Sequence, residues 1–231
     1  MNNKFKLFDV RWVSHTAGPS PVFNSYGPNC RTELFFMGCE KARQGNPCPD
    51  CFNPDLWEDI AGARELDPYE AVKHIEQHAP QKYITLVGGE PLDQLKPLST
   101  LCSLLHNKGF HIILFTHYTM EEMLKGETDN YTDTEDMLTL HKSCDIIIDG
   151  VYDPSERIYD ESWCDGFKDA IGSGNQVVWD MQEKRGIAAR DIAGLYLNYD
   201  NVLRFITKQS VPWIELTDIV NANNKKGNDN I

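Results

Sequence analysis

The sequence lacks any run of about eighteen consecutive apolar residues, so we expect no segment to span a membrane and no membrane partner. Its first residues, MNNKFKLFDVRWV, also lack the basic start and long apolar stretch of a secretory signal. Both observations favour a cytoplasmic protein.

Basic residues are in deficit. The chain of 231 residues has 22 Lys and Arg against 35 Asp and Glu, a net charge of −13. An acidic surface repels phosphate backbones, which argues against nucleic-acid binding as the main role. The hydrophobic content of 41% is ordinary for a globular protein. We expect one domain over residues 1–220 and a polar, disordered tail over residues 221–231.

The seven cysteines contain no second C-x-x-C motif that would complete a four-cysteine zinc pattern. In a reducing cytosol such residues indicate metal ligands or core thiols rather than disulfides. Cys102 falls on the apolar side of a predicted helix, which indicates a core position. Cys144 and Cys164 have no partner in spacing.

Cys39, Cys48 and Cys51 form a cluster in sequence, with the last two in a C-x-x-C pair and the first at the end of an apolar run. Three thiolates can hold a soft metal or an iron–sulfur cluster. A four-iron cluster normally takes four cysteines, so one held by three keeps one iron open for a ligand. A structural zinc site with a fourth ligand from elsewhere and a chance arrangement both remain open at this point.

A second motif is YITLVGGEP, from Tyr83 to Pro91, in which an apolar run ends in two glycines, an acid and a proline. It predicts a buried strand that ends at Gly88, Gly89 and Glu90. Glycines there let the backbone approach a ligand, and Glu90 offers an acceptor to an ammonium group. An ordinary tight turn would have the same composition.

Apolar runs and helical spacing alternate along the chain and predict an α/β fold with right-handed parallel β-α-β units. The expected strands are residues 1–13, 32–37, 82–87, 110–115, 145–149, 172–180 and 203–206. The expected helices begin after Asp67, before Leu95, at Thr119 and at Asp133.

Ligands bind at the carboxyl ends of parallel strands. The cysteine loop, the Gly88–Glu90 turn, Thr116 and Asp149 all follow such ends, which predicts a single site. We expect His117 to lie at the surface. For Arg31 two roles remain open, an ion pair with a carboxylate and a surface cation.

Several stretches together resemble the radical S-adenosylmethionine (SAM) superfamily, and within it the activating proteins of anaerobic ribonucleotide reductases. They are Gly27-Pro28, Arg31, Phe35-Phe36, Gly38-Cys39, Cys51-Phe52-Asn53-Pro54, Trp57, LFTHYTMEEM, DIIIDGVYD and GSGNQVVWD. Two departures are plain. The family usually spaces its cysteines C-x3-C-x2-C, whereas eight residues follow Cys39 here, and Asp50 stands where many members have an aromatic residue. The longer gap should cost roughly 1 kcal/mol or less.

This resemblance implies a partial, open (β/α) barrel of mostly parallel strands. It implies a [4Fe-4S] cluster on Cys39, Cys48 and Cys51, with no general acid or base required. The SAM contacts that it implies, some only weakly, are Gly88, Gly89 and Glu90 at the amino group, the backbone from Asp50 to Phe52 along the adenine, Asp149 at the ribose, and Thr116.

The implied reaction is reductive cleavage of SAM to a 5′-deoxyadenosyl radical that takes a hydrogen atom from a glycine of a partner reductase. A glycyl radical enzyme and an electron donor such as a flavodoxin or ferredoxin are the expected partners. Two alternatives remain: a radical SAM enzyme acting on a small molecule or peptide, for example one resembling 7-carboxy-7-deazaguanine synthase, and a non-catalytic zinc module.

Overall fold

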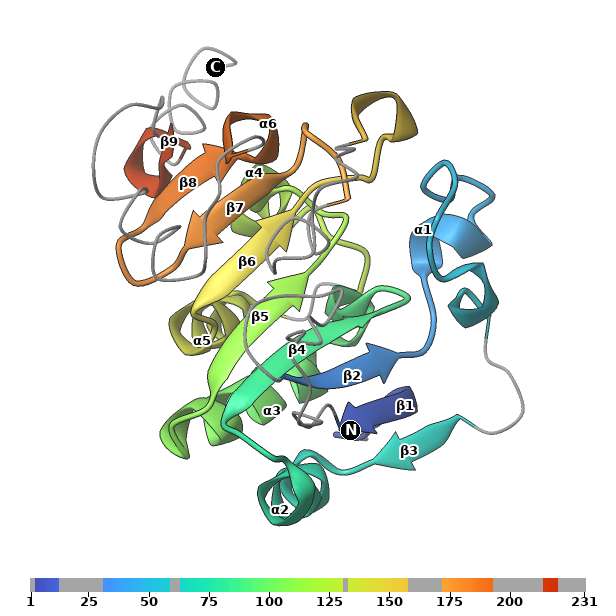
Figure 1. The fold of residues 1–231 in the computed structure, drawn as a ribbon, viewed down its shortest axis with the longest axis vertical. Coiled ribbons are helices and arrows are strands. Elements are labelled where there is room, and N and C mark those ends of the chain that lie inside the picture. Colours follow the sequence, from blue (N-terminus) through green and yellow to red (C-terminus); the bar gives the residue numbers. More distant parts are fainter. Residues whose placement is uncertain are drawn as a thin grey trace, which may run out of the picture.

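The computed structural model describes residues 3–12, 31–58, 63–130, 133–157, 172–192 and 214–219. They form one nine-stranded sheet in the order β3-β1-β2-β4-β5-β6-β7-β8-β9 (Figure 1). Its strands are β1 (Phe5–Trp12), β2 (Thr32–Phe36), β3 (Arg64–Leu66), β4 (Tyr83–Gly88), β5 (His111–Phe115), β6 (Ile146–Asp149), β7 (Val177–Asp180), β8 (Arg185–Ala188) and β9 (Ile214–Glu215).

The centre of the sheet is parallel. β2 pairs with β4, β4 with β5, and β5 with β6, all in the same direction. The residues of β2 and β6 are buried throughout, as expected for apolar strands covered on both faces. The four predicted central strands are therefore confirmed, and their carboxyl ends lie along one edge of the sheet.

The flanks are antiparallel, so the expectation of mostly parallel strands holds for the centre of the sheet and not for its two sides. β1 runs antiparallel to both β2 and β3, and β7, β8 and β9 continue the sheet from β6 in antiparallel pairs. β7 and β8 are joined by a short hairpin, a connection that forces antiparallel pairing. Among the described strands, β3 and β9 are the two edges, so this sheet is mixed and does not close.

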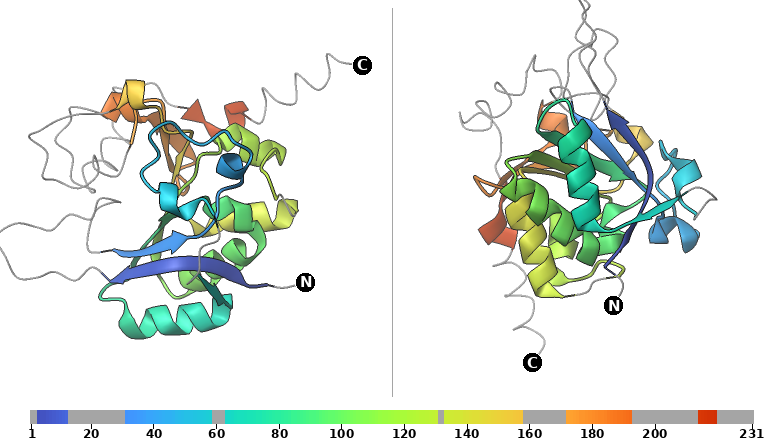
Figure 2. Two further views of the ribbon diagram at one scale, coloured as in Figure 1. Left: turned by 90° about the vertical axis from the view of Figure 1, so that its right-hand side faces the viewer. Right: turned by 90° about the horizontal axis from the view of Figure 1, so that it is seen from below.

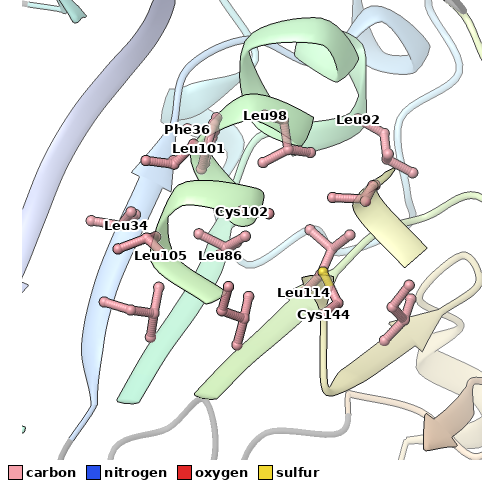
Figure 3. Close-up of a cluster of buried hydrophobic side chains, with 14 of the residues drawn as sticks. Leu34, Phe36, Leu86, Leu92, Leu98, Leu101, Cys102, Leu105, Leu114 and Cys144 are labelled. Carbon is pink, nitrogen blue, oxygen red and sulfur yellow. The ribbon is translucent and has the colours of Figure 1, made fainter. Parts of the chain in front are cut away.

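Three helices cover one face of the sheet: α2 (Pro68–His78), α3 (Leu95–Asn107) and α5 (Thr134–Ser143) (Figure 2). α3 contacts both of the others. Below them lies a core of leucine, isoleucine and phenylalanine side chains that includes Leu98, Leu101 and Cys102 (Figure 3). The predicted core position of Cys102 is confirmed, and Cys144 joins it.

The predicted helix signals are confirmed in detail. Asp67 accepts hydrogen bonds from the first turn of α2, and Thr119 and Glu122 form a capping box for α4 (Met120–Lys125). Gly126 ends α4 in the left-handed conformation. The shorter elements are α1 (Glu40–Arg43), α6 (Ala189–Ile192) and the 3-10 turns Pro54–Leu56, Pro91–Gln94 and Pro154–Glu156.

Within the described ranges, no helix is long and apolar enough to cross a bilayer. The strand expected at residues 203–206, the tail at 221–231, and Cys30 and Cys164 lie outside the described residues.

Candidate functional site

A cleft of about 240 Å³ opens at the carboxyl ends of the parallel strands. Its wall joins the cysteine loop after β2, the turn after β4, the end of β5 and the segment after β6. The lining residues are Cys39, Cys48, Cys51, Phe52, Asn53, Trp57, Val87, Gly88, Gly89, Glu90, Phe115, Thr116, His117, Gly150, Tyr152, Gly172 and Gln176. The structure thus brings together the two motifs that the sequence singled out.

The three clustered cysteines all line this cleft. Cys39 is 8% exposed, and Cys48 and Cys51 are half-buried. Burial raises the pKa of Cys39 to about 12 and also raises the pKa of Cys48. The indole Nε1–H of Trp57 donates to Cys51 Sγ at 3.4 Å. A metal that binds here must displace thiol protons, as thiolate ligation generally requires.

This donor set fits a sulfur-bound cofactor, because three thiols and an indole N–H face one space. In the described part of the chain, no three His, Cys, Asp or Glu side chains converge as ligands of a single metal ion. The cysteines of a cluster bind different irons, so they stand further apart than the ligands of a single ion. Three thiols that line one cavity are compatible with this wider spacing.

The eight-residue gap after Cys39 folds back on the protein. Its first residues form α1, and the backbone N–H of Glu40 donates to Asp93 Oδ2 at 2.6 Å. Gln44 reaches Asp129 at 3.4 Å. The gap is thus a helical turn tied to the neighbouring loops, and it leaves the three cysteines on one cleft.

Gly88 and Gly89 are required by the protein's own backbone. Gly88 has φ +124°, and a Cβ there would lie 2.3 Å from the carbonyl oxygen of Phe36. A Cβ on Gly89 would lie 2.0 Å from the carbonyl oxygen of Gly38. The N–H of Glu90 donates to that same Gly38 oxygen at 2.7 Å. These glycines let the turn pack against the cysteine loop. This packing is a second reason for glycine at both positions, beside the predicted approach of a ligand.

Glu90 is 1% exposed, and both of its carboxylate oxygens have partners. Oε1 accepts from Leu92 N–H and from the Thr116 hydroxyl, both at 2.9 Å. Oε2 accepts from His117 N–H at 2.9 Å and pairs with His117 Nδ1 at 2.7 Å. Thr116 and Glu90 therefore belong to one network on the cleft wall.

His117 was expected at the surface, and that expectation was wrong: its side chain is only 11% exposed and lines the cleft. Burial by itself would lower the pKa of His117, but the charge of Glu90 and its hydrogen bond outweigh burial and raise that pKa. The ring contacts that of Tyr118 at 4.1 Å between centroids. The histidine is thus held between an acid and an aromatic ring.

Two predicted ligand contacts are not on the cleft wall. Asp149 is buried, and its carboxylate accepts from Met120 N–H at 2.6 Å, from Trp179 Nε1–H at 2.9 Å and from Val177 N–H at 3.2 Å. Burial raises the pKa of Asp149 to about 6 against these hydrogen bonds. Its oxygens hold the β6–β7 end together, and its contact with a ribose stays a prediction.

Asp50 is exposed in a turn with φ +48° and also lies off the wall. Phe52, by contrast, lines the cleft, is 55% exposed and lies 4.9 Å from the ring of Tyr152. Of the segment from Asp50 to Phe52, Cys51 and Phe52 thus line the cleft, and the contact of this segment with an adenine stays a prediction.

Tyr152 and Gln176 are among the wall residues that sequence reasoning missed. Gln176 accepts from Ser173 N–H and donates to the Gly150 oxygen, both at 3.1 Å. Both residues belong to stretches that had been quoted for the resemblance, DIIIDGVYD and GSGNQVVWD, so that resemblance was the available signal.

Arg31 is fully buried, so it is not a surface cation. Its guanidinium donates to Thr85 Oγ1 at 2.7 Å and to the His111 oxygen at 3.1 Å, near the amino end of β5. It therefore braces the end of the sheet opposite the cleft.

Comparison with known proteins agrees with this geometry. A protein from Enterobacteria phage T4, named an anaerobic ribonucleoside-triphosphate reductase-activating protein, is 29% identical over 163 residues, or 66% of this chain and 85% of that protein. Two proteins named pyruvate formate-lyase-activating enzyme are 34% identical over 108 residues (Clostridium pasteurianum) and 35% identical over 95 (Staphylococcus aureus).

The alignment with the Clostridium protein covers 43% of each chain, and that with the Staphylococcus protein covers 39% of this chain and 36% of the other. This chain thus spans less than half the length of either. The profile of the 4Fe-4S single cluster domain matches residues 25–179, which hold the three cleft cysteines and most of the sheet. The chain belongs to the family of 4Fe-4S single cluster domain proteins.

Proposed function

We propose that this protein is a radical SAM activating enzyme that generates a glycyl radical on an anaerobic ribonucleotide reductase. The observation that carries the proposal is the cleft at the carboxyl ends of β2 and β4, where Cys39, Cys48 and Cys51 face the Gly88–Glu90 turn. The phage T4 relative supports the choice of reductase, since this chain aligns with 85% of it but with less than half of the pyruvate formate-lyase-activating enzymes.

In this proposal the three cysteines hold a [4Fe-4S] cluster. The open, mixed sheet then serves as a partial barrel of the radical SAM type. When bound and reduced, the cluster supplies the electron that cleaves SAM and so provides the radical that takes the glycine hydrogen. The protein's own residues bind, orient and exclude water. The turn from Gly88 to Glu90 holds the amino group of SAM, and the backbone from Asp50 to Phe52 runs along its adenine.

The partner is expected to complete the site. Phe52 lines the cleft and is 55% exposed, so the wall formed by the described residues is open beside it. A glycine-bearing loop of the reductase could enter there and shield the radical from stray hydrogen donors. An electron donor such as a flavodoxin or ferredoxin supplies the reducing electron in the cytoplasm.

The test is electron paramagnetic resonance of the candidate reductase after anaerobic incubation with reconstituted protein, SAM and a chemical reductant. We expect a glycine-centred doublet that depends on all three components, with faster SAM cleavage when the reductase is present. A parallel sample with pyruvate formate-lyase tests the second candidate partner. Two relatives of this chain, both named pyruvate formate-lyase-activating enzyme, favour that partner.

Three results would redirect the proposal. A doublet on pyruvate formate-lyase alone would change the partner. Rapid SAM cleavage that neither enzyme accelerates, with label in a small-molecule product, would favour the small-molecule reading. A colourless protein that binds zinc and does not cleave SAM would favour the metal-binding module.

A further inference from the structure

Trp57 is bound to both ends of the cysteine loop. Its indole Nε1–H donates to Cys51 Sγ at 3.4 Å, and its backbone oxygen accepts from the N–H of Cys39 at 3.1 Å. Leu56, one residue earlier, accepts from the N–H of Gly38 at 2.8 Å. Backbone bonds of this kind form with any side chain at position 57, so they do not explain the indole or its N–H.

A 3-10 turn, Pro54–Leu56, brings the ring to the sulfur. The turn begins at Asn53, whose side-chain amide donates to the Gly88 oxygen at 3.2 Å, and it ends at Trp57. The ring is half-buried and lines the cleft beside Cys51. An indole has a single polar group, Nε1–H, which donates and does not accept. Here that donor is directed at a sulfur six residues earlier in the chain.

The other two cleft cysteines have backbone donors. A backbone hydrogen bond with Ala42 lowers the pKa of Cys39, and one with Tyr152 lowers the pKa of Cys48, each against the larger effect of burial. A hydrogen bond that lowers the pKa of a thiol favours the thiolate, so the backbone group is an N–H. Each cleft cysteine thus has an N–H donor. At Cys51 this donor is a side chain, which a substitution can remove.

Hydrogen bonds to the sulfurs are among the properties that set the reduction potential of an iron–sulfur cluster. Reduction adds one electron and no proton, so the cluster and its ligand sulfurs become more negative. An N–H donor stabilises the more negative state more strongly, because charge strengthens a hydrogen bond. Loss of such a donor should therefore lower the potential and make reduction harder.

We propose that the Trp57 indole raises the reduction potential of the cluster through its hydrogen bond to Cys51. The proposal rests on the function proposed above, since it takes Cys51 as a ligand of a [4Fe-4S] cluster. Trp57 is then a positioning residue that acts through Cys51, and it makes the cluster easier to reduce by a donor such as a flavodoxin or ferredoxin. The alternative is that the ring only fills the wall of the cleft.

The reduction potential separates these two roles. Cluster-loaded protein without SAM is titrated anaerobically with dithionite and redox mediators, and the reduced cluster is followed by electron paramagnetic resonance. Trp57→Phe keeps an aromatic ring and removes the N–H. Replacement of Trp57 by benzothienylalanine, introduced at a nonsense codon, keeps the two-ring shape and puts a sulfur in place of the N–H. Trp179→Phe is the control, since that indole lies in the core and donates to Asp149 at 2.9 Å.

We expect the ratio of reduced to oxidised cluster at a fixed applied potential to fall about threefold or more in both Trp57 variants, a shift of about 28 mV for one electron. Trp179→Phe should match wild type. An unchanged potential in both Trp57 variants would overturn the inference. A shift in Trp57→Phe that the benzothienyl variant lacks would overturn it as well, because shape would then set the potential. So would a folded benzothienyl variant without a cluster, because the N–H would then serve assembly.

Failure of the proposed function gives a different result. Wild-type protein that takes up no four-iron cluster on reconstitution would overturn both proposals. A cluster whose potential depends on the Trp57 N–H, in a protein that forms no glycyl radical on either candidate enzyme, would overturn only the function. A glycyl radical with a potential that is insensitive to Trp57 would overturn only the role of the indole.

Discussion

Two groups of cysteines lie in different parts of the molecule, one in the core under the helices and one in the cleft at the carboxyl ends of the parallel strands, and their surroundings differ. Cys102 and Cys144 are fully buried among the leucines of the helix side (Figure 3). A hydrogen bond with Cys102 and then burial raise the pKa of Cys144 well above its ordinary value. Such thiols are inert packing residues.

The cleft cysteines have polar neighbours instead. Trp57 donates an N–H to Cys51, and the charges of Glu90 and Lys41 reach Cys48. They also face an open space, whereas the helix-side thiols face side chains. The same residue type therefore packs in the core at one place and, in our proposal, binds a cofactor at the other. The difference predicts which substitutions cost stability and which cost function.

The largest loss of stability is expected at Gly89, where the turn after β4 packs directly against the backbone of the cysteine loop. Gly89→Ala would place a Cβ 2.0 Å from the Gly38 oxygen, so the turn and the cysteine loop must separate. We expect a loss of more than about 4 kcal/mol in the free energy of unfolding. Gly45→Ala is the matched control, since nothing lies within 4 Å of its Cβ although its φ is +80°. It should cost about 1–2 kcal/mol. Denaturant titration measures both, and equal costs would contradict the close approach of the two loops.

Substitutions in the core under the helices should lower the stability of the protein without changing its iron content. Leu98→Ala removes a fully buried side chain from α3, which should cost about 2–5 kcal/mol. Leu138→Ala on α5, 47% exposed, should change stability by less than about 0.5 kcal/mol. Iron per folded chain should equal wild type in both variants. Loss of iron from folded Leu98→Ala protein would mean that the two sides are coupled.

Asp149 should make the stability of the protein depend on pH. Its substitution should leave the affinity for SAM unchanged. Its pKa of about 6 in the folded protein lies above the usual 3.8, so its protonated form is favoured on folding. That stabilisation is complete below pH ~4 and is lost as pH rises through 6. At about 1.4 kcal/mol per pH unit, the stability of wild type relative to Asp149→Asn should fall by roughly 3 kcal/mol across this interval. A flat difference between pH 4 and 7 would contradict the assignment, and weaker SAM binding would return Asp149 to the site.

Glu90→Ala should weaken SAM binding. We expect it to keep its cluster but to bind SAM more weakly by roughly 1.5–3 kcal/mol, because the turn loses its carboxylate. It should also cost stability, since Glu90 is buried and hydrogen-bonded through both oxygens. Glu76→Ala, which removes a surface ion pair with Lys108, is the control. Dialysis with SAM measures the difference, and an unchanged affinity would leave the Gly88–Glu90 turn with only a structural role.

Sequence patterns were sufficient for the local parts of this structure. Apolar runs located β2, β4, β5 and β6, and cap residues such as Asp67 and Thr119 located helix starts, because those signals involve near neighbours in the chain. The antiparallel flanks were not predictable in the same way. The short β3 and β8 carry little pattern, and pairing direction depends on tertiary contacts.

The site shows the same difference between features set by near neighbours in the chain and features set by distant residues. Spacing identified Cys39, Cys48 and Cys51, but the burial of His117 depends on Glu90, 27 residues earlier. The partners of Asp149 include Trp179, 30 residues later. A carboxylate at a strand end has the same sequence signature whether it faces a ligand or an indole, so only the fold separates the two roles.

The most direct test of the central claim is iron per chain after anaerobic reconstitution of five single alanine variants. The account predicts about four irons per chain in wild type, Cys102→Ala and Cys144→Ala, with the visible absorption of a four-iron cluster. It predicts little or no iron in Cys39→Ala, Cys48→Ala and Cys51→Ala, since each thiolate is needed for assembly. Full iron in folded Cys48→Ala, or its loss from folded Cys102→Ala, would contradict it.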